Sequence, residues 1–257
     1  MCNQVVAIAL SVMSTLIFVH GACVRDASWW WSLMVKPLAE HGIRSVTVPL
    51  PSCGETGGEL GDLYADARAC SRAIADVDGP VILCGHSYGG VVITEAGVDD
   101  RVTQLLYVTS VMPEAGQSQA EIIGDAPAPW MAPGDDGTVG VYADLIRELF
   151  VQDCDEVTTT RALERLTRQA VTPFMQAPRQ IVWQQKPATY FVCTEDLATP
   201  PRRRSVNASE QALDLSSSQL GTTRFSHAPT RSRRASPLRS SRAAEWTIWA
   251  PSKRTTA

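Results

Sequence analysis

The chain lacks the cysteine pattern of a disulfide-stabilised or zinc-binding protein. Its 257 residues include seven cysteines, an odd number, and no two of them form a Cys-x-x-Cys pair. A disulfide framework and a metal site are therefore not expected. Because free thiols are typical of a reducing compartment, the sequence favours a cytoplasmic protein.

Long apolar runs are also missing. The N-terminal apolar stretches at 5–10 and 16–19 are separated by polar residues and are shorter than the ~20 residues that span a bilayer. No Lys or Arg precedes them, whereas a secretory signal begins with positive charge. Met13 offers an alternative start, which would leave residues 1–12 as an unstructured extension. We expect no membrane partner.

The chain has little net charge, but its charges are divided unevenly. The total of -4 argues against a general nucleic-acid-binding protein. Residues 201–257 hold 11 Lys or Arg and 3 Asp or Glu, so residues 1–200 hold 12 and 24. The basic tail is rich in Arg, Ser, Ala, Thr and Pro, shows no sustained strand or helix period, and lacks interleaved aromatic residues. Such a composition disfavours a packed core, and we expect no nucleic-acid partner.

Strand and helix patterns alternate between residues 13 and 200. Short apolar runs predict buried strands, and segments with helical spacing lie between them. Strands buried on both faces and joined by helices form a parallel sheet covered on both sides, so the fold class is α/β. The strands are expected at 16–19, 45–48, 81–84, 105–108 and 188–193, and the helices at 29–40, at 63–76 and after residue 89.

The helix expected at 63–76 is amphipathic. Its apolar residues Leu63, Ala67, Cys70 and Ile74 recur at steps of four, three and four, which places them on one buried face. The charged residues of the segment, Asp66 among them, are expected to face solvent.

Residues 112–187 interrupt the alternation. Several prolines near the start predict loops, and helices are expected at 141–150 and 160–170. An insertion of this size between two core strands is typical of a helical cap over a binding site. Trp130 and Trp183 are candidate lining residues of a hydrophobic substrate pocket, unless they only pack the cap onto the core.

One short motif carries chemistry. The sequence Gly-His-Ser-Tyr-Gly at 85–89 follows an expected strand and precedes an expected helix. In that context G-x-S-x-G is a nucleophile elbow, a sharp turn that exposes the serine Oγ above the sheet edge. Both glycines are needed because a Cβ would collide with neighbouring backbone. Ser87 is therefore a candidate nucleophile, and the alternative is a turn that merely joins strand to helix.

Four segments together resemble the α/β-hydrolase superfamily, and more narrowly its branch of plant methyl-ester esterases, hydroxynitrile lyases and bacterial relatives. The segments are His20-Gly21-Ala22-Cys23, Trp29-Trp30-Trp31, the elbow, and Cys193-Thr194-Glu195-Asp196 followed by Pro200. The resemblance implies cleavage of a small carboxylic ester by a triad in chain order Ser, acid, His, without a metal or an organic cofactor.

The resemblance also assigns an oxyanion hole. The backbone N–H groups of Ala22 and Tyr88 would bind the developing oxyanion. Gly21 stands where the similar lyases carry a threonine that helps to hold a cyanohydrin hydroxyl, so glycine favours an esterase. His20 either orients this loop beside the substrate pocket or is a structural histidine.

The acid and the base of the implied triad lie near the C-terminus. Asp196 is the expected acid and Glu195 the alternative, unless either carboxylate only caps a turn. His227 is the one histidine after the acid, and its Ser-His-x-Pro setting partly resembles the family segment, so by position it is the base. The family also has a core strand before this histidine and an apolar helix after it, which the sequence does not show.

Two hypotheses account for residues 201–257. The tail is either a divergent folded segment that brings His227 to Ser87, or an out-of-frame translation of a high-GC gene that has lost the true histidine. Two alternative functions are a catalytically impaired protein that binds a small hydrophobic ligand under its cap, and a hydroxynitrile-lyase-like enzyme.

Overall fold

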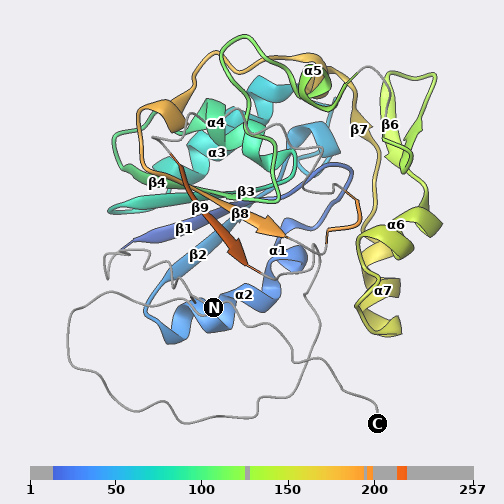
Figure 1. Cartoon of the computed structure of the whole chain (residues 1–257), viewed down its shortest axis with the longest axis horizontal. Helices are drawn as coiled ribbons and strands as arrows, with labels where there is room; N and C mark the ends of the chain where they lie inside the picture. Colours follow the sequence, from blue (N-terminus) through green and yellow to red (C-terminus); the bar gives the residue numbers. More distant parts are fainter. Residues whose placement is uncertain (1–13, 125–127, 194–195, 199–212, 219–257) are drawn as a thin grey trace.

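The centre of the molecule is a parallel β-sheet of six strands (Figure 1). The computed structural model describes residues 14–124, 128–193, 196–198 and 213–218, so the expected extension at 1–12 lies outside it. The strands follow the spatial order β2-β1-β3-β4-β8-β9, and every neighbouring pair is parallel. They are β1 (Thr15–Val19), β2 (Arg44–Val48), β3 (Val81–His86), β4 (Val102–Val108), β8 (Ala188–Cys193) and β9 (Leu213–Ser218).

Helices cover both faces of this sheet. Figure 1 shows α3 and α4 on one side and α1 and α2 on the other. Alternate residues of β1 enter different cores, since Ile17 packs with the α3 and α4 side and Phe18 stacks on Trp31 on the opposite side. The elements are α1 (Ala27–Trp30), α2 (Ser32–Glu40), the short 3₁₀ helix η1 (Pro51–Cys53), α3 (Leu63–Ala75) and α4 (Gly89–Ala96).

Helix α3 begins where the sequence predicts and buries the predicted apolar face. The side chain of Asp62 accepts a hydrogen bond from the Ala65 N–H and caps the helix. One expectation is wrong: Asp66 is fully buried instead of facing solvent. Its carboxylate is bonded by groups from other segments of the chain, which helical spacing alone cannot reveal.

The segment between β4 and β8 forms a cap of mixed structure, so the expectation of a helical cap was incomplete. A small antiparallel sheet lies within it, and its strands of two to four residues are too short to show an alternating pattern. The elements are α5 (Gln119–Ile123), β5 (Met131–Pro133), β6 (Thr138–Val141), α6 (Ala143–Leu149), α7 (Glu156–Leu163), β7 (Gln169–Ala170), α8 (Thr172–Met175) and η2 (Val182–Gln184).

Strand β9 comes from the basic tail and extends the sheet beyond residue 200, where the core was expected to end. It pairs in register with β8, from Ala188 opposite Leu213 to Cys193 opposite Ser218. The sequence did not predict this strand because Leu-Asp-Leu-Ser-Ser-Ser contains only two apolar residues. Among the described residues, no helix is long and apolar enough to cross a membrane.

Candidate active site

The elbow has the geometry that its sequence predicts. Ser87 lies between β3 and α4 with a φ of 51°, in the left-handed region that a residue with a side chain rarely adopts. A Cβ on Gly85 would lie 2.6 Å from the Gly89 backbone, and a Cβ on Gly89 would collide with the Val19 carbonyl oxygen. Both glycines are therefore required for this turn, which fixes the serine at the carboxyl end of β3.

The loop after β1 lies directly against the elbow. A Cβ on Gly21 would be 3.0 Å from Nδ1 of His86 and 3.1 Å from Cβ of Ser87. The N–H groups of Ala22 and Tyr88 meet no acceptor in the described part of the chain. One of these N–H groups belongs to the residue after the serine and the other to the loop against the elbow, and an oxyanion hole needs backbone donors in such positions.

The side chain of His20 links this loop to Glu55 through hydrogen bonds. Its Nδ1 lies 2.8 Å from the Gly21 carbonyl oxygen, and its Nε2 lies 2.6 Å from Oε2 of Glu55. Glu55 also accepts hydrogen bonds from the Leu50 and Ala27 N–H groups. Burial opposes ionisation of Glu55, but the bonds from His20 and the backbone outweigh it and lower the pKa of this carboxyl below its usual value. Sequence reasoning had not singled out Glu55.

Asp196 lies after β8, two strands from the serine along the sheet edge. It is 4% exposed. Thr109 Oγ1 donates to its Oδ2 at 2.5 Å, and the Ala198 N–H donates to its Oδ1 at 2.9 Å. A buried, hydrogen-bonded carboxylate at this place has the environment of a triad acid. Thr109, which sequence reasoning missed, follows β4 with a φ of 40°.

Glu195 and His227 lie outside the described residues. The structure therefore brings Ser87, the two N–H donors and the loop of His20 together, and it places Asp196 at the same edge of the sheet.

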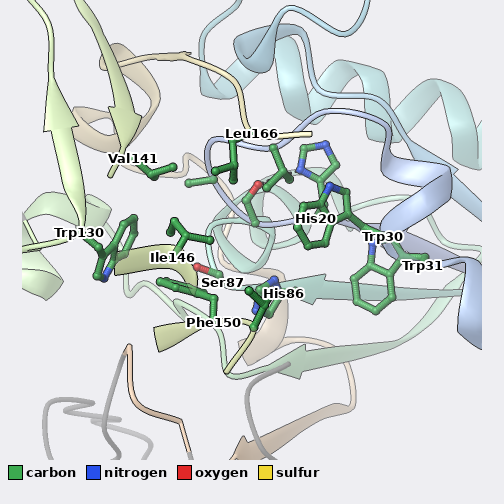
Figure 2. A pocket seen from close by; sticks show the side chains of 14 residues that line it. His20, Trp30, Trp31, His86, Ser87, Trp130, Val141, Ile146, Phe150 and Leu166 are labelled. Atoms are coloured by element: carbon green, nitrogen blue, oxygen red, sulfur yellow. Dashed lines mark hydrogen bonds between the residues drawn. The ribbon is translucent and has the colours of Figure 1, made fainter. Parts of the chain in front are cut away.

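A cavity of about 70 Å³ lies over Ser87 between the cap and the core. Figure 2 shows Ile146 and Phe150 of the cap beside Ser87, with Trp130 further to the left. The indole Nε1 of Trp130 is buried and has no hydrogen-bond partner among the described residues. Apart from His20, His86 and Ser87, the lining is apolar: Gly21, Ala22, Val24, Trp30, Trp31, Trp130, Val141, Ile146, Phe150, Val151 and Leu166.

Trp183 does not line this cavity, which corrects one of the predicted pocket residues. Its ring is 5% exposed within the core beneath the cap, and its Nε1 donates to the Pro113 carbonyl oxygen at 2.8 Å. Trp183 therefore anchors the cap. Its position in the sequence does not distinguish a residue that anchors the cap from one that lines the pocket. The tryptophans at 30 and 31 line the pocket instead.

The described residues contain no group of three or more His, Cys, Asp or Glu side chains that could hold a metal ion. The buried thiols are also poor ligands or nucleophiles. Burial raises the pKa of Cys23, Cys70 and Cys84 to about 12.

A parallel sheet with a serine on a left-handed elbow, a loop packed against that elbow and a cap is the arrangement of an α/β-hydrolase. The chain matches the Alpha/beta hydrolase family over residues 16–248 and belongs to it. The matched region includes most of the basic tail.

Curated relatives share limited sequence identity with the chain. The alpha/beta hydrolase nvfD of Aspergillus novofumigatus is 26% identical over 231 residues, which cover 83% of this chain and 89% of that protein. The pyrethroid hydrolase of Sphingobium wenxiniae is 28% identical over 209 residues, 73% of each chain. Methylesterase 8 of Arabidopsis thaliana is 31% identical over 115 residues, 42% of this chain and 41% of that protein.

Solved structures show the same fold. A pyrethroid hydrolase from Sphingobium faniae JZ-2 has a TM-score of 0.71 at 21% identity, with 82% of this chain and 90% of that chain covered. Polyneuridine aldehyde esterase has a TM-score of 0.69 at 16% identity, with 82% and 92% covered.

Proposed function

We propose that this protein hydrolyses a small carboxylic ester through Ser87. The observation that carries the proposal is the left-handed serine of the elbow, which lies at the floor of an apolar cavity. The N–H groups of the neighbouring Tyr88 and of Ala22 in the adjoining loop have no acceptor among the described residues. The names of similar proteins support an ester as substrate, since they include a methylesterase and polyneuridine aldehyde esterase.

The proposed reaction is acyl transfer through Ser87, with His227 as the base and Asp196 as the acid. Ser87 Oγ attacks the acyl carbon while His227 accepts its proton, and the oxyanion receives hydrogen bonds from Ala22 and Tyr88. The carbonyl re-forms as the C–O bond to the alcohol breaks, and the histidine gives its proton to the leaving alcohol. Water then attacks the acyl-serine in the same way and releases the acid. Asp196 orients the histidine and stabilises its charged form.

The cavity indicates the shape of the ester. Its apolar lining favours an uncharged substrate with a hydrophobic acyl or alcohol group. Trp130 supplies one buried N–H that can donate to an oxygen of the substrate. A cytoplasmic location is part of the proposal, because none of the six cysteines among the described residues is joined in a disulfide.

Turnover of p-nitrophenyl acetate tests the proposal against the ligand-binding alternative. We expect release of p-nitrophenol with saturation kinetics and no dependence on added metal. Binding of a small apolar ester without any release of its alcohol would contradict the proposal.

Asp196→Asn is expected to lower kcat by about 10⁴-fold, because an amide neither holds the histidine tautomer nor stabilises the imidazolium. Steady-state kinetics with p-nitrophenyl acetate measure the loss. Asp100→Asn is the control, since Asp100 is exposed, and it should keep the parent rate. A kcat within tenfold of the parent in Asp196→Asn would remove this residue from the triad.

A further inference from the structure

A buried polar network lies beneath the oxyanion loop, and its centre is the carboxylate of Asp66. Oδ1 accepts a hydrogen bond from the Ser52 N–H at 2.9 Å. Oδ2 accepts from the Ser52 hydroxyl at 2.6 Å and from the Tyr88 hydroxyl at 2.7 Å. Asp66, Ser52 and Tyr88 are all completely inaccessible to solvent. A carboxylate buried to this degree needs such donors, because burying a charge without hydrogen bonds is strongly unfavourable.

The network continues to the loop after β1. Gln169 of β7 donates from Nε2 to the Ser52 Oγ at 2.9 Å. Its Oε1 accepts the Cys23 N–H, also at 2.9 Å. Both of these residues are completely buried as well. The network therefore ends at the Cys23 N–H and at the side chain of Tyr88. Cys23 directly follows Ala22, so the two ends adjoin the Ala22 and Tyr88 N–H groups that have no acceptor among the described residues.

We infer that Asp66 is a positioning residue of the oxyanion hole, which fixes Tyr88 directly and the Cys23 backbone through Ser52 and Gln169. The inference rests on the proposed function. It concerns the residues that hold the donors of the oxyanion hole in place for the transition state of that reaction. An oxyanion donor acts only when it lies 2.7–3.1 Å from the developing charge. The network ties one donor to the other through buried side chains, so their spacing does not depend on a solvent-exposed loop.

The electrostatics agree with this arrangement. Burial and the charge of Asp66 raise the pKa of Tyr88 well above its usual value, so its hydroxyl keeps the proton that it donates. Burial also raises the pKa of Asp66, against the opposing effect of the bonds from Ser52 and Tyr88.

Tyr88→Phe and Asp66→Asn test the inference. The first keeps the ring, which packs 5.4 Å from Phe174 between centroids, and removes only the hydroxyl. The second keeps the size of the side chain and replaces one acceptor by a donor. We expect each to lower kcat for p-nitrophenyl acetate about tenfold, with KM within twofold, because a small displacement of a catalytic group has this scale of effect. Binding of a trifluoromethyl ketone, which forms an oxyanion on Ser87, should weaken by the same factor.

Tyr64→Phe is the matched control. Tyr64 lies on α3, as Asp66 does. Its hydroxyl donates to the Ala177 carbonyl oxygen at 3.0 Å, outside the network. The Tyr64→Phe variant should be less stable than the parent, with the same kcat and the same affinity for the ketone. If Tyr88→Phe and Asp66→Asn behave like Tyr64→Phe, the network is only structural and the inference is overturned.

Backbone amide hydrogen exchange separates this inference from the proposed function, because it needs no turnover. In Asp66→Asn we expect the Cys23 amide to exchange at least tenfold faster than in the parent, while Tyr64→Phe leaves it unchanged. Unchanged Cys23 protection in Asp66→Asn would overturn the inference even in an active enzyme. Faster exchange in a protein without esterase activity would support the network and reject the proposed function.

Discussion

Ser87→Ala is expected to abolish ester hydrolysis, with kcat for p-nitrophenyl acetate reduced by about 10⁶-fold. The elbow places this side chain at the cavity floor, and alanine removes the hydroxyl oxygen that forms the acyl-enzyme in the proposed reaction. Fold and stability should stay close to the parent, because alanine tolerates the turn as serine does. Any residual rate would come from the oxyanion hole and substrate binding alone.

Ser71→Ala serves as the control for this prediction. Its hydroxyl bonds the Ala67 carbonyl oxygen within α3, away from the cavity. The Ser71→Ala variant should hydrolyse p-nitrophenyl acetate at the parent rate. If Ser87→Ala retains more than about 1% of the parent kcat, the acyl-serine mechanism at this elbow is wrong.

His227→Ala is expected to cost as much as loss of the serine, because a nucleophile and its base act as one unit. Without the base the Ser87 hydroxyl keeps its proton and is a weak nucleophile. The measurement is kcat at neutral pH, with His41→Ala as control, since His41 caps α2 through the Pro37 carbonyl oxygen. Parent activity in His227→Ala would show that the base is elsewhere.

The coding DNA offers an independent check on His227. From the third base of codon 220, the new triplets carry the first two bases of the following codons. Thr codons begin with AC and most Arg codons begin with CG, so the Thr-Thr-Arg sequence at 222–224 becomes three shifted triplets that end in AC, AC and CG. CAC encodes histidine and CCG encodes proline. The shifted frame can therefore encode His-x-Pro at this place. Such a sequence, with an apolar helix after it, would support the out-of-frame hypothesis and remove His227 from the triad. If no other frame encodes one, the divergent-tail hypothesis stands.

The parts of the fold that could be predicted are those determined by local pattern. The buried strands and α3 follow from apolar periodicity, and the elbow follows from two glycines whose missing side chains the structure explains. Strand β9 was missed because its composition is polar, and a strand at the end of a sheet depends on its partner more than on its own propensity.

The supporting residues of the site were harder to predict. Asp66 was expected to face solvent because charge on an amphipathic helix normally does so. Its partners Ser52 and Tyr88 are 14 and 22 positions away in the chain, so only the tertiary structure reveals them. Nothing in the sequence marked Thr109 as a residue of the site except its place at the end of a core strand. Trp183 shows the same limit, since an aromatic residue in a cap can line a pocket or anchor it.

Labelling with a fluorophosphonate probe tests the central claim most directly, because such a probe reacts with an activated serine and needs no knowledge of the natural ester. Intact-mass and peptide measurements on the full chain should show one adduct per molecule, located on Ser87 and absent in Ser87→Ala. Labelling at another residue, or no adduct at all, would contradict the proposal that this protein is a serine esterase.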